Sequence, residues 1–286
     1  MDERTRGWID GFIGVAIFSG SLPATRVAVA DLDPVFLTAA RALFAGLLGL
    51  GLLAALKAER PARRDLFPLV LVAVGVVLGF PLLTALALKH ITAAHSIVFV
   101  GLLPVATATF AVLLGGERPR WSFWVFSLIG AALVAGFAMT RGAEGSVIGD
   151  LLMLAAVVVC GLGYAEGGRL ARRLGGWQVI CWALVISAPF MAVVAIYAWP
   201  ISVAHVGAPA WTGLAYVSLF SMLIGFVFWY RGLALGGVAA VGQLQLLQPF
   251  MGLALAAGLL GEPVGWPMAA VTAGVVLCVA GAKRFA

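Results

Sequence analysis

The chain has 286 residues, of which 63% are hydrophobic and only 10% are charged. Since a soluble domain carries roughly a quarter of charged residues, this composition excludes an ordinary soluble core and makes the bilayer the solvent for much of the apolar surface. The net charge of +6 does not indicate a nucleic-acid partner, because the basic residues lie in short loops between apolar runs and form no continuous patch.

Charges, prolines and turn clusters divide the chain into ten apolar stretches, each close to the about 20 residues that cross a bilayer as a helix. The first stretch is too long for the hydrophobic core of a cleavable signal peptide, so we expect it to remain as the first span. The predicted spans are 8–30, 34–56, 66–88, 92–115, 121–140, 149–170, 177–199, 211–231, 238–260 and 264–282.

Lysine and arginine are distributed unevenly between the two sides of these spans. If the N-terminus is cytoplasmic, the outer side holds only Arg26, Lys89 and Arg141, and Arg41 lies within the second span, so the other 14 of the 18 basic residues are inside. Positive charges accumulate in cytoplasmic loops. We therefore expect a multi-pass membrane protein with both termini in the cytoplasm.

The three cysteines, Cys160, Cys181 and Cys278, all lie inside apolar runs and have neither CxxC nor metal-site spacing. We interpret them as small core residues and expect no disulfide. The three histidines are scattered along the chain, so we also expect no metal site and no cofactor.

The chain matches itself at an offset of 145 residues. Pro104 is followed after thirteen residues by Glu117, and Pro249 is followed after thirteen residues by Glu262; Trp121 then matches Trp266. The offset spans five predicted helices, and because five is odd the two copies must enter the membrane from opposite sides. The sequence therefore predicts an all-α membrane protein of two inverted five-helix repeats, residues 1–141 and 146–286, which is typical of secondary transporters.

Three segments carry a family resemblance. They are "FLTAARALFAG" (Phe36 to Gly46), "ALALKHITAAHSIVFVGLLPVATATFAVLLGGERP" (Ala85 to Pro119) and "GLALGGVAAVGQLQLLQPFMGLALAAGLLGEPV" (Gly232 to Val264). The chain resembles the EamA-type transporters of the drug/metabolite transporter superfamily, and among them the aromatic amino-acid exporter group. The resemblance implies a ten-helix, basket-like fold whose central cavity is lined chiefly by spans 1, 3, 4, 6, 8 and 9. It also implies a location in the bacterial inner (plasma) membrane.

Pro104 and Pro249 fall in the middle of the fourth and ninth predicted spans. A proline there removes a backbone hydrogen bond and kinks a helix. The pair could act as hinges beside the cavity, or could be static kinks that shape the packing.

Ionisable residues at membrane depth are functional candidates because they are costly to place there. Arg41 could bind a substrate carboxylate, and Glu166 could bind an ammonium group or a proton. Alternatively, Glu166 and Arg169, spaced i and i+3, pair with each other. His95, one turn into the fourth span, could serve proton coupling or be a hydrogen-bonded packing residue.

Two further features have structural interpretations. Glu117 and Glu262 precede spans five and ten, so their carboxylates could accept hydrogen bonds from the exposed N–H groups of those helices; the alternative is proton coupling. Gly163 and Gly167 have the small-residue spacing that lets helices approach closely. This spacing does not by itself indicate a dimer, and we expect a monomer.

Gln243, Gln245 and Gln248 crowd the ninth span just before Pro249. Amides in hydrocarbon need partners, so we expect at least one to contact substrate or water. On an ideal α-helix Gln245 and Gln248 share a face, whereas Gln243 lies about 200° from Gln245. Further candidates for the cavity wall are Tyr164, Ser19, Ser21, Trp182 and Tyr230.

These observations favour a secondary transporter that exports amino acids or related small metabolites by alternating access, with the bilayer and a small-molecule substrate as its partners. The chain has no GxxxxGK[ST] phosphate loop for ATP, and no HExxH or GxSxG motif that would indicate an intramembrane enzyme. The alternatives are a channel or a structural membrane subunit, or a transporter of another substrate class such as a nucleobase or a drug-like cation.

Overall fold

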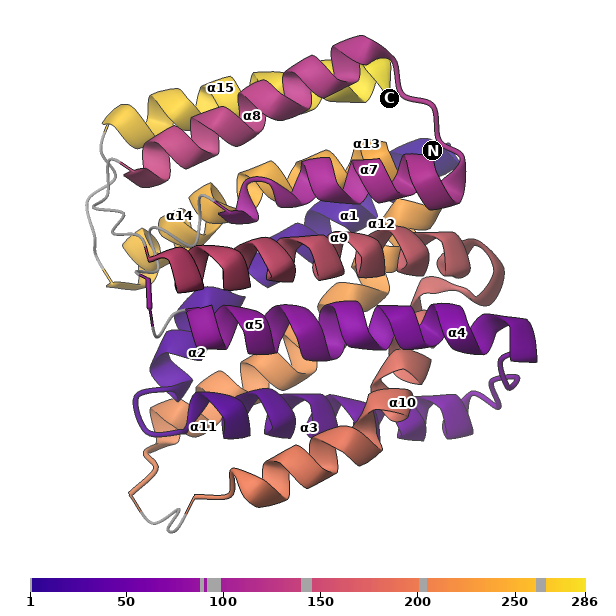
Figure 1. The fold of residues 1–286 in the computed structure, drawn as a ribbon, viewed down its shortest axis with the longest axis vertical. Helices are drawn as coiled ribbons and strands as arrows, with labels where there is room; N and C mark the ends of the chain where they lie inside the picture. The colour runs from indigo at the N-terminus through magenta and orange to yellow at the C-terminus, as the bar shows by residue number, and fades with distance from the viewer. Residues whose placement is uncertain (1, 88–89, 92–98, 140–145, 201–204, 261–265) are drawn as a thin grey trace.

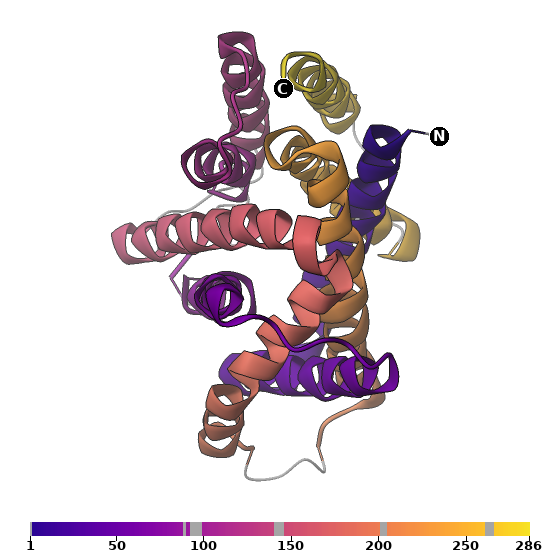
Figure 2. The ribbon, with the colours of Figure 1, turned by 90° about the vertical axis from the view of Figure 1, so that its right-hand side faces the viewer.

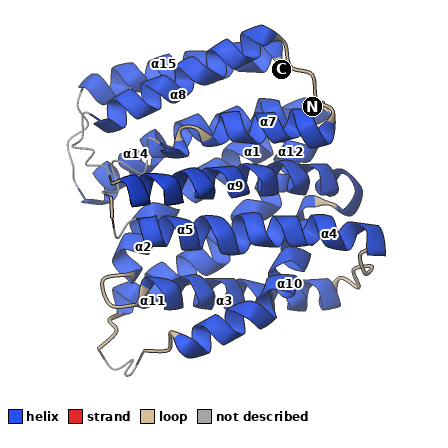
Figure 3. Ribbon diagram, in the orientation of Figure 1, coloured by secondary structure: helices blue, strands red, loops and turns tan. Residues whose placement is uncertain are grey.

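A computed structural model describes residues 2–87, 90–91, 99–139, 146–200, 205–260 and 266–286. Within these ranges every regular element is a helix, as Figure 3 shows, and the elements run side by side as a bundle (Figure 1). The predicted all-α fold is therefore confirmed. Five of the helical rods are long and apolar enough to cross a membrane by themselves.

The first half of the chain follows the five predicted spans. The first span is divided into two helices and the third into three, and the described part of the fourth is its second portion. The elements are α1 (Glu3–Ser19), α2 (Ser21–Ala28), α3 (Pro34–Ala55), α4 (Arg63–Val72), η1 (Ala73–Gly79), α5 (Phe80–Ala87), α7 (Leu103–Gly115) and α8 (Trp121–Met139).

The second half also follows its five predicted spans. Its sixth span is a single helix, and its eighth and ninth spans are each divided into three. The elements are α9 (Val147–Leu174), α10 (Gly176–Tyr197), α11 (Ala208–Tyr216), η2 (Val217–Ile224), α12 (Gly225–Gly236), α13 (Val238–Gly242), η3 (Gln243–Leu247), α14 (Gln248–Leu260) and α15 (Trp266–Phe285).

Local sequence explains where several helices begin. The Asp33 carboxylate accepts hydrogen bonds from the Val35 and Phe36 nitrogens, and Pro34 occupies the first turn of α3, where no N–H is needed. Single glycines connect α9 to α10 and α12 to α13. These are Gly175 and Gly237, with φ of 87° and 90°, a conformation that other residues rarely adopt.

The two prolines break their spans rather than kink continuous helices, which corrects the expectation of mid-helix prolines. Pro104 is the second residue of α7 and Pro249 the second residue of α14, positions where a missing N–H costs little. In the second half the Gln245 carbonyl, which would pair with residue 249, accepts from the Gln248 nitrogen instead. The result is the 3₁₀ segment η3.

Equivalent spans carry equivalent π-helical segments, which the sequence analysis missed. η1 covers residues 73–79 of the third span, and η2 covers residues 217–224 of the eighth. Adding the repeat offset of 145 to 73–79 gives 218–224, which lies inside η2. π-Helical turns are rare and often mark functional sites, and here they recur at one position in both copies.

Helix pairing shows how the two halves are combined. α3 packs along α10, and α8 along α15, so that each pair joins equivalent spans of the two copies. α1 packs along α12, and the equivalent contact, of α9 with α5, η1 and α4, is also present. This exchange is what two inverted repeats produce. Figures 1 and 2 both show α8 and α15 as a pair at one edge of the bundle.

Glycines allow the closest of these contacts. On α1 and α12 the backbones of Gly7 and Gly236 touch, and a Cβ at Gly232 would lie 2.6 Å from the Gly11 nitrogen. The predicted close packing at Gly163 and Gly167 is confirmed. A Cβ at Gly163 would lie 3.2 Å from the Gly75 Cα, and one at Gly167 would overlap the Tyr230 ring.

Candidate substrate site

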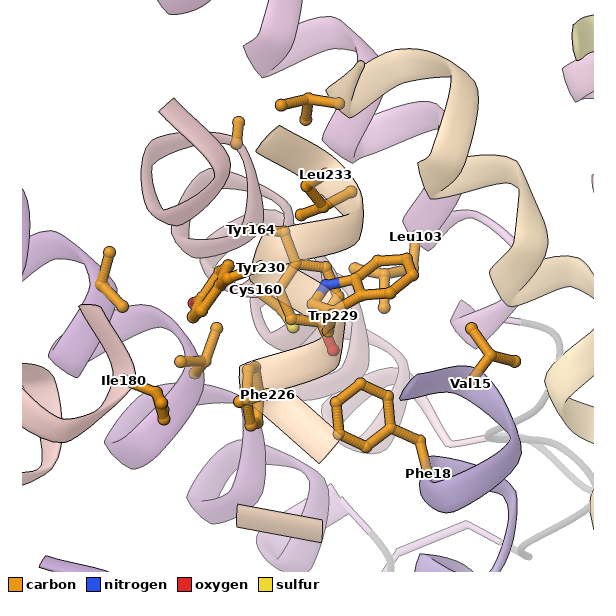
Figure 4. Close-up of a cluster of buried hydrophobic side chains, with 14 of the residues drawn as sticks. Val15, Phe18, Leu103, Cys160, Tyr164, Ile180, Phe226, Trp229, Tyr230 and Leu233 are labelled. Carbon is orange, nitrogen blue, oxygen red and sulfur yellow. The ribbon is translucent and has the colours of Figure 1, made fainter. Parts of the chain in front are cut away.

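Tyr164 lies in the interior, between the two copies, and aromatic rings surround it. Its ring centroid is 5.4 Å from that of Trp229 and 6.0 Å from that of Phe226, both on α12. Phe18 of α1 completes the cluster, with centroids 5.0 Å from Phe226 and 6.2 Å from Trp229. Figure 4 shows these four rings together, with Tyr230 and Cys160 beside Tyr164. The cluster joins the first, sixth and eighth spans.

The 3₁₀ segment places two amides in this interior. Gln243 is 0% exposed and Gln245 is 1% exposed, whereas Gln248 is only half-buried. Gln245 lies beside Tyr164, although the contact between the two side chains does not have hydrogen-bond geometry. Within the described residues, none of the side-chain nitrogen and oxygen atoms of Gln243 and Gln245 forms a hydrogen bond. Buried amides without partners are costly, so this arrangement requires a functional explanation.

Other buried polar atoms in the described part of the chain also lack hydrogen-bond partners. They include the indole nitrogens of Trp229 and Trp182 and the hydroxyls of Thr84 and Thr107. Thr84 and Trp229 are separated by 145 residues, so they occupy equivalent positions in the third and eighth spans. The unpaired groups are therefore distributed over both copies.

The remaining sequence candidates are placed as follows. Ser19 donates to the Val15 carbonyl at 2.8 Å, Ser21 donates to the Ser221 hydroxyl at 2.8 Å, and Tyr230 donates to the Gly163 carbonyl at 3.3 Å. These three hydroxyls already have partners. Trp182 is half-buried on α10. His95 lies outside the described residues.

Charged candidates divide into a satisfied pair and an isolated arginine. Arg169 and Glu166 form an ion pair, with the Arg169 Nε 3.0 Å from a Glu166 carboxylate oxygen. Arg41 of α3 lies in the interior near Tyr164. Its Nε has no hydrogen-bond partner in the described part of the protein.

Both chain termini lie at the same end of the bundle, at the right of Figure 1, which we call the terminal face. Glu117 caps a helix there. Its carboxylate accepts hydrogen bonds from the Val238 nitrogen at 2.9 Å and the Ala239 nitrogen at 2.8 Å, and from Arg172 at 2.9 Å. The capping chemistry was expected, but the helix predicted for Glu117 was wrong: it caps α13 in the other copy rather than the fifth span. Glu262 lies outside the described residues.

Two more ion pairs connect the copies at the terminal face. Asp65 of α4 pairs with Arg173 of α9. Asp10 of α1 pairs with Arg231 of α12, with an N–O distance of 3.2 Å. We name these two pairs and the Glu117–Arg172 pair the inter-repeat ion pairs. Asp10 and Asp65 were missed as candidates. Asp10 could have been found from the sequence, because a carboxylate inside an apolar span is itself a candidate functional residue.

Two open pockets lie at the terminal face, of about 410 and 260 Å³. The larger lies between the start of α1 and the end of α15, and the smaller lies beside Glu117 and Gly237. Neither is lined by the aromatic cluster. The described residues contain no group of three or more His, Cys, Asp or Glu side chains placed to hold a metal ion.

Comparison with known proteins gives consistent matches along the whole chain. The EamA-like transporter family matches twice, at residues 5–139 and 147–282. The "Uncharacterized transporter YdeK" of Bacillus subtilis is 64% identical over the full length of both chains. A "Probable terminal-alkyne amino-acid exporter" of Streptantibioticus cattleyicolor is 29% identical, over 93% of this chain and 89% of that protein.

The fold is also found among solved structures. One crystal structure superposes with a TM-score of 0.84 at 23% sequence identity, covering 99% of this chain and 100% of the other. At this identity the likeness concerns the fold alone.

Proposed function

Since the chain belongs to the EamA-like transporter family and is a multi-pass membrane transporter, we propose that it exports an amino acid or a related small metabolite by alternating access. The substrate would bind between the two copies, beside Tyr164. Both halves of this site come from one chain, so we propose that the monomer is the working unit.

The observation that carries this proposal is the unpartnered Gln245 amide next to the aromatic cluster. Both ends of the Gln245 side chain are buried without a hydrogen bond, and Tyr164 and the Trp229 indole nitrogen lie in the same region. A core selected only for stability would satisfy or replace these groups. A small polar ligand would satisfy them by accepting from the amide nitrogen and the indole, and by donating to the amide oxygen.

The ring cluster provides the apolar complement to these polar groups. Phe18, Tyr164, Phe226 and Trp229 form one aromatic cluster, and the Gln245 amide lies beside its Tyr164. An amphipathic metabolite needs both kinds of surface. The named function of the amino-acid exporter relative, which aligns with most of this chain, supports the same substrate class.

The inter-repeat ion pairs support alternating access. Each one joins a residue of the first copy to a residue of the second at the terminal face. The count of positive charges favours the cytoplasm as the location of this face. We propose that the pairs hold the cytoplasmic side closed, and that transport requires them to separate while the opposite side closes.

The experiment is a flux assay on the purified protein in liposomes, using a panel of amino acids and related metabolites. We expect saturable, substrate-specific flux of at least one amino acid. Gln245→Ala should reduce this flux at least about tenfold, as expected for loss of a buried hydrogen bond to a ligand. The matched control is Gln248→Ala, which removes an amide of the same span that is only half-buried.

Two results would contradict the proposal. One is the absence of flux for the whole panel together with ion conductance, which would indicate a channel. The other is flux of a nucleobase or a drug-like cation in place of any amino acid, which would keep the transporter and reject the substrate class.

A further inference from the structure

Arg41 is a half-buried arginine of the bundle that has no counter-ion among the described residues. It is the eighth residue of α3, roughly 10 Å along the helix from Pro34. The side chain is partly accessible, and it lies within electrostatic range of Tyr164. Its Nε is buried and makes no hydrogen bond within the described residues.

The buried carboxylates of the described residues already form ion pairs with other arginines. Asp10, Asp65 and Glu166 are the buried carboxylates in the described part of the chain. Each of them is paired with a different arginine, namely Arg231, Arg173 and Arg169. None of these pairs includes Arg41, so no buried carboxylate in the described part of the chain balances its charge.

An uncompensated cation at this depth is expensive, because both water and a counter-charge are missing. Arginine also remains protonated under all ordinary conditions. Such a group is stable in the resting protein only because part of the side chain stays accessible, and Arg41 is indeed half-buried rather than fully buried. An anion that enters the site would remove the penalty.

The chemistry of the guanidinium indicates which anion fits. Its planar fork donates two parallel hydrogen bonds to a carboxylate. Tyr164 joins Arg41 to the rest of the candidate site, since it also lies near Gln245 and packs against Trp229. A carboxylate at Arg41 would thus place the remainder of a small substrate against the Gln245 amide and the rings.

We propose that Arg41 binds the carboxylate of the transported molecule, so that the protein selects substrates with a free carboxylate. This inference rests on the proposed function and narrows it from polar metabolites to carboxylate-bearing ones. Arg41 then accounts for charge selection, whereas Gln245 and the aromatic cluster account for recognition of the rest of the molecule.

The test compares matched compounds on the purified wild-type protein, so it does not depend on any variant folding. Thermal stabilisation is measured with each of the twenty amino acids, with their carboxamides and with the corresponding carboxylic acids that lack the amino group. We expect at least one amino acid to stabilise the protein, and its carboxamide to need a concentration on the order of 100-fold higher, as for loss of one partner of a buried charge pair.

Variants then assign the preference to Arg41. Arg41→Gln should abolish the discrimination between acid and carboxamide, and Arg41→Lys should retain part of it, because lysine keeps the charge but not the fork. Arg169→Gln is the matched control, since Arg169 is already paired with Glu166; it should keep the full preference for the acid. Size-exclusion profiles establish that each variant is folded.

The outcomes separate this inference from the proposed function. Equal binding of acid and carboxamide by the wild-type protein, or an acid preference that survives in Arg41→Gln, would overturn the role of Arg41 while leaving amino-acid transport intact. Arg41-dependent binding of carboxylic acids that lack the amino group, with no binding of amino acids, would support Arg41 and reject the amino-acid class.

Discussion

The Glu117 carboxylate lies 2.9 Å from the backbone nitrogen of Val238, although the two residues belong to opposite copies of the repeat. The contact ties the loop after the fourth span to the first turn of the ninth. It therefore joins the two halves that must move apart if the terminal face is to open.

Replacing Glu117 by Ala should both destabilise the protein and favour opening of the terminal face. The change removes two hydrogen bonds to the start of α13 and the partner of Arg172. Loss of a helix cap costs about 1–2 kcal/mol. We expect a lower melting temperature and faster labelling of a cysteine introduced at Ala239, which is buried beside this contact.

The matched control for this prediction is Glu59→Ala, because Glu59 is an exposed acidic residue in the loop before α4. It should change neither the melting temperature nor the labelling. The cysteine introduced by Ala239→Cys is labelled in both backgrounds. If its labelling rate is the same with Glu117→Ala as with Glu59→Ala, the Glu117 contact does not keep the terminal face closed.

The ion pair between Asp65 and Arg173 should also contribute to the stability of the protein. Arg173→Ala leaves the buried Asp65 carboxylate without its partner, which should cost roughly 1–3 kcal/mol, towards the lower end because Arg173 is 43% exposed. The exchange Asp65→Arg with Arg173→Asp should recover part of the loss. A double-mutant cycle in thermal unfolding measures the coupling, and strictly additive effects would show that the pair contributes nothing.

The repeat could be predicted from the sequence because proline, glutamate and tryptophan are scarce and recur at one offset. The match of Pro104 with Pro249 located the equivalent breaks in spans four and nine. The spans could likewise be predicted from hydropathy, because a long apolar run in a bilayer must satisfy its own backbone hydrogen bonds and therefore forms a helix. These signals are local, and so they could be read without knowing which helices touch.

The partners of individual side chains could not be predicted in this way. Glu117 was assigned to the helix that follows it in sequence, whereas it caps α13, which lies 121 residues further along the chain. The π-helical segments η1 and η2 also left no signal, because they depend on packing rather than on composition. Gln243 was placed away from Gln245 by assuming an ideal α-helix, but Pro249 imposes a 3₁₀ segment and both amides are buried.

Gly167→Ala should disturb the candidate site through Tyr230. The added methyl would overlap the Tyr230 ring, which is fully buried and packs against Phe226. Overpacking of this kind costs typically about 1–3 kcal/mol. We expect a lower melting temperature and reduced transport.

The matched control for Gly167→Ala is Gly51→Ala on α3. Outside its own stretch of helix, no atom of the described residues lies within 4 Å of a Cβ added at Gly51. Because alanine is the better helix former, this variant should be neutral or slightly stabilised. Equal effects of the two changes would show that the contact between Gly167 and Tyr230 has no special role.

Cysteine labelling should establish the orientation. Cys160, Cys181 and Cys278 are all buried, so the wild-type protein should not react with a membrane-impermeant maleimide on intact cells. His205→Cys, in the exposed turn before α11, should react from outside. Thr5→Cys, at the exposed start of α1, should react only after the membrane is permeabilised. The reverse pattern would place the terminal face outside the cell.

Stability and transport should respond in opposite directions when the buried amides are made apolar. Gln243→Leu and Gln245→Leu each remove an amide that has no hydrogen-bond partner in the described structure and replace it with a side chain of similar size. A buried polar group without a hydrogen-bond partner lowers the stability of a protein by about 1–3 kcal/mol. Both variants should therefore melt at a higher temperature than the wild-type protein.

Only Gln245→Leu should lose transport strongly, because Gln245 is the amide beside Tyr164. The amide nitrogen and oxygen would then be retained in the natural protein at a cost in stability, in order to bind substrate. Melting curves and liposome flux measured on the same preparations test both parts. A destabilised Gln245→Leu variant would mean that its amide is satisfied in the resting protein, and full transport by that variant would remove Gln245 from the substrate site.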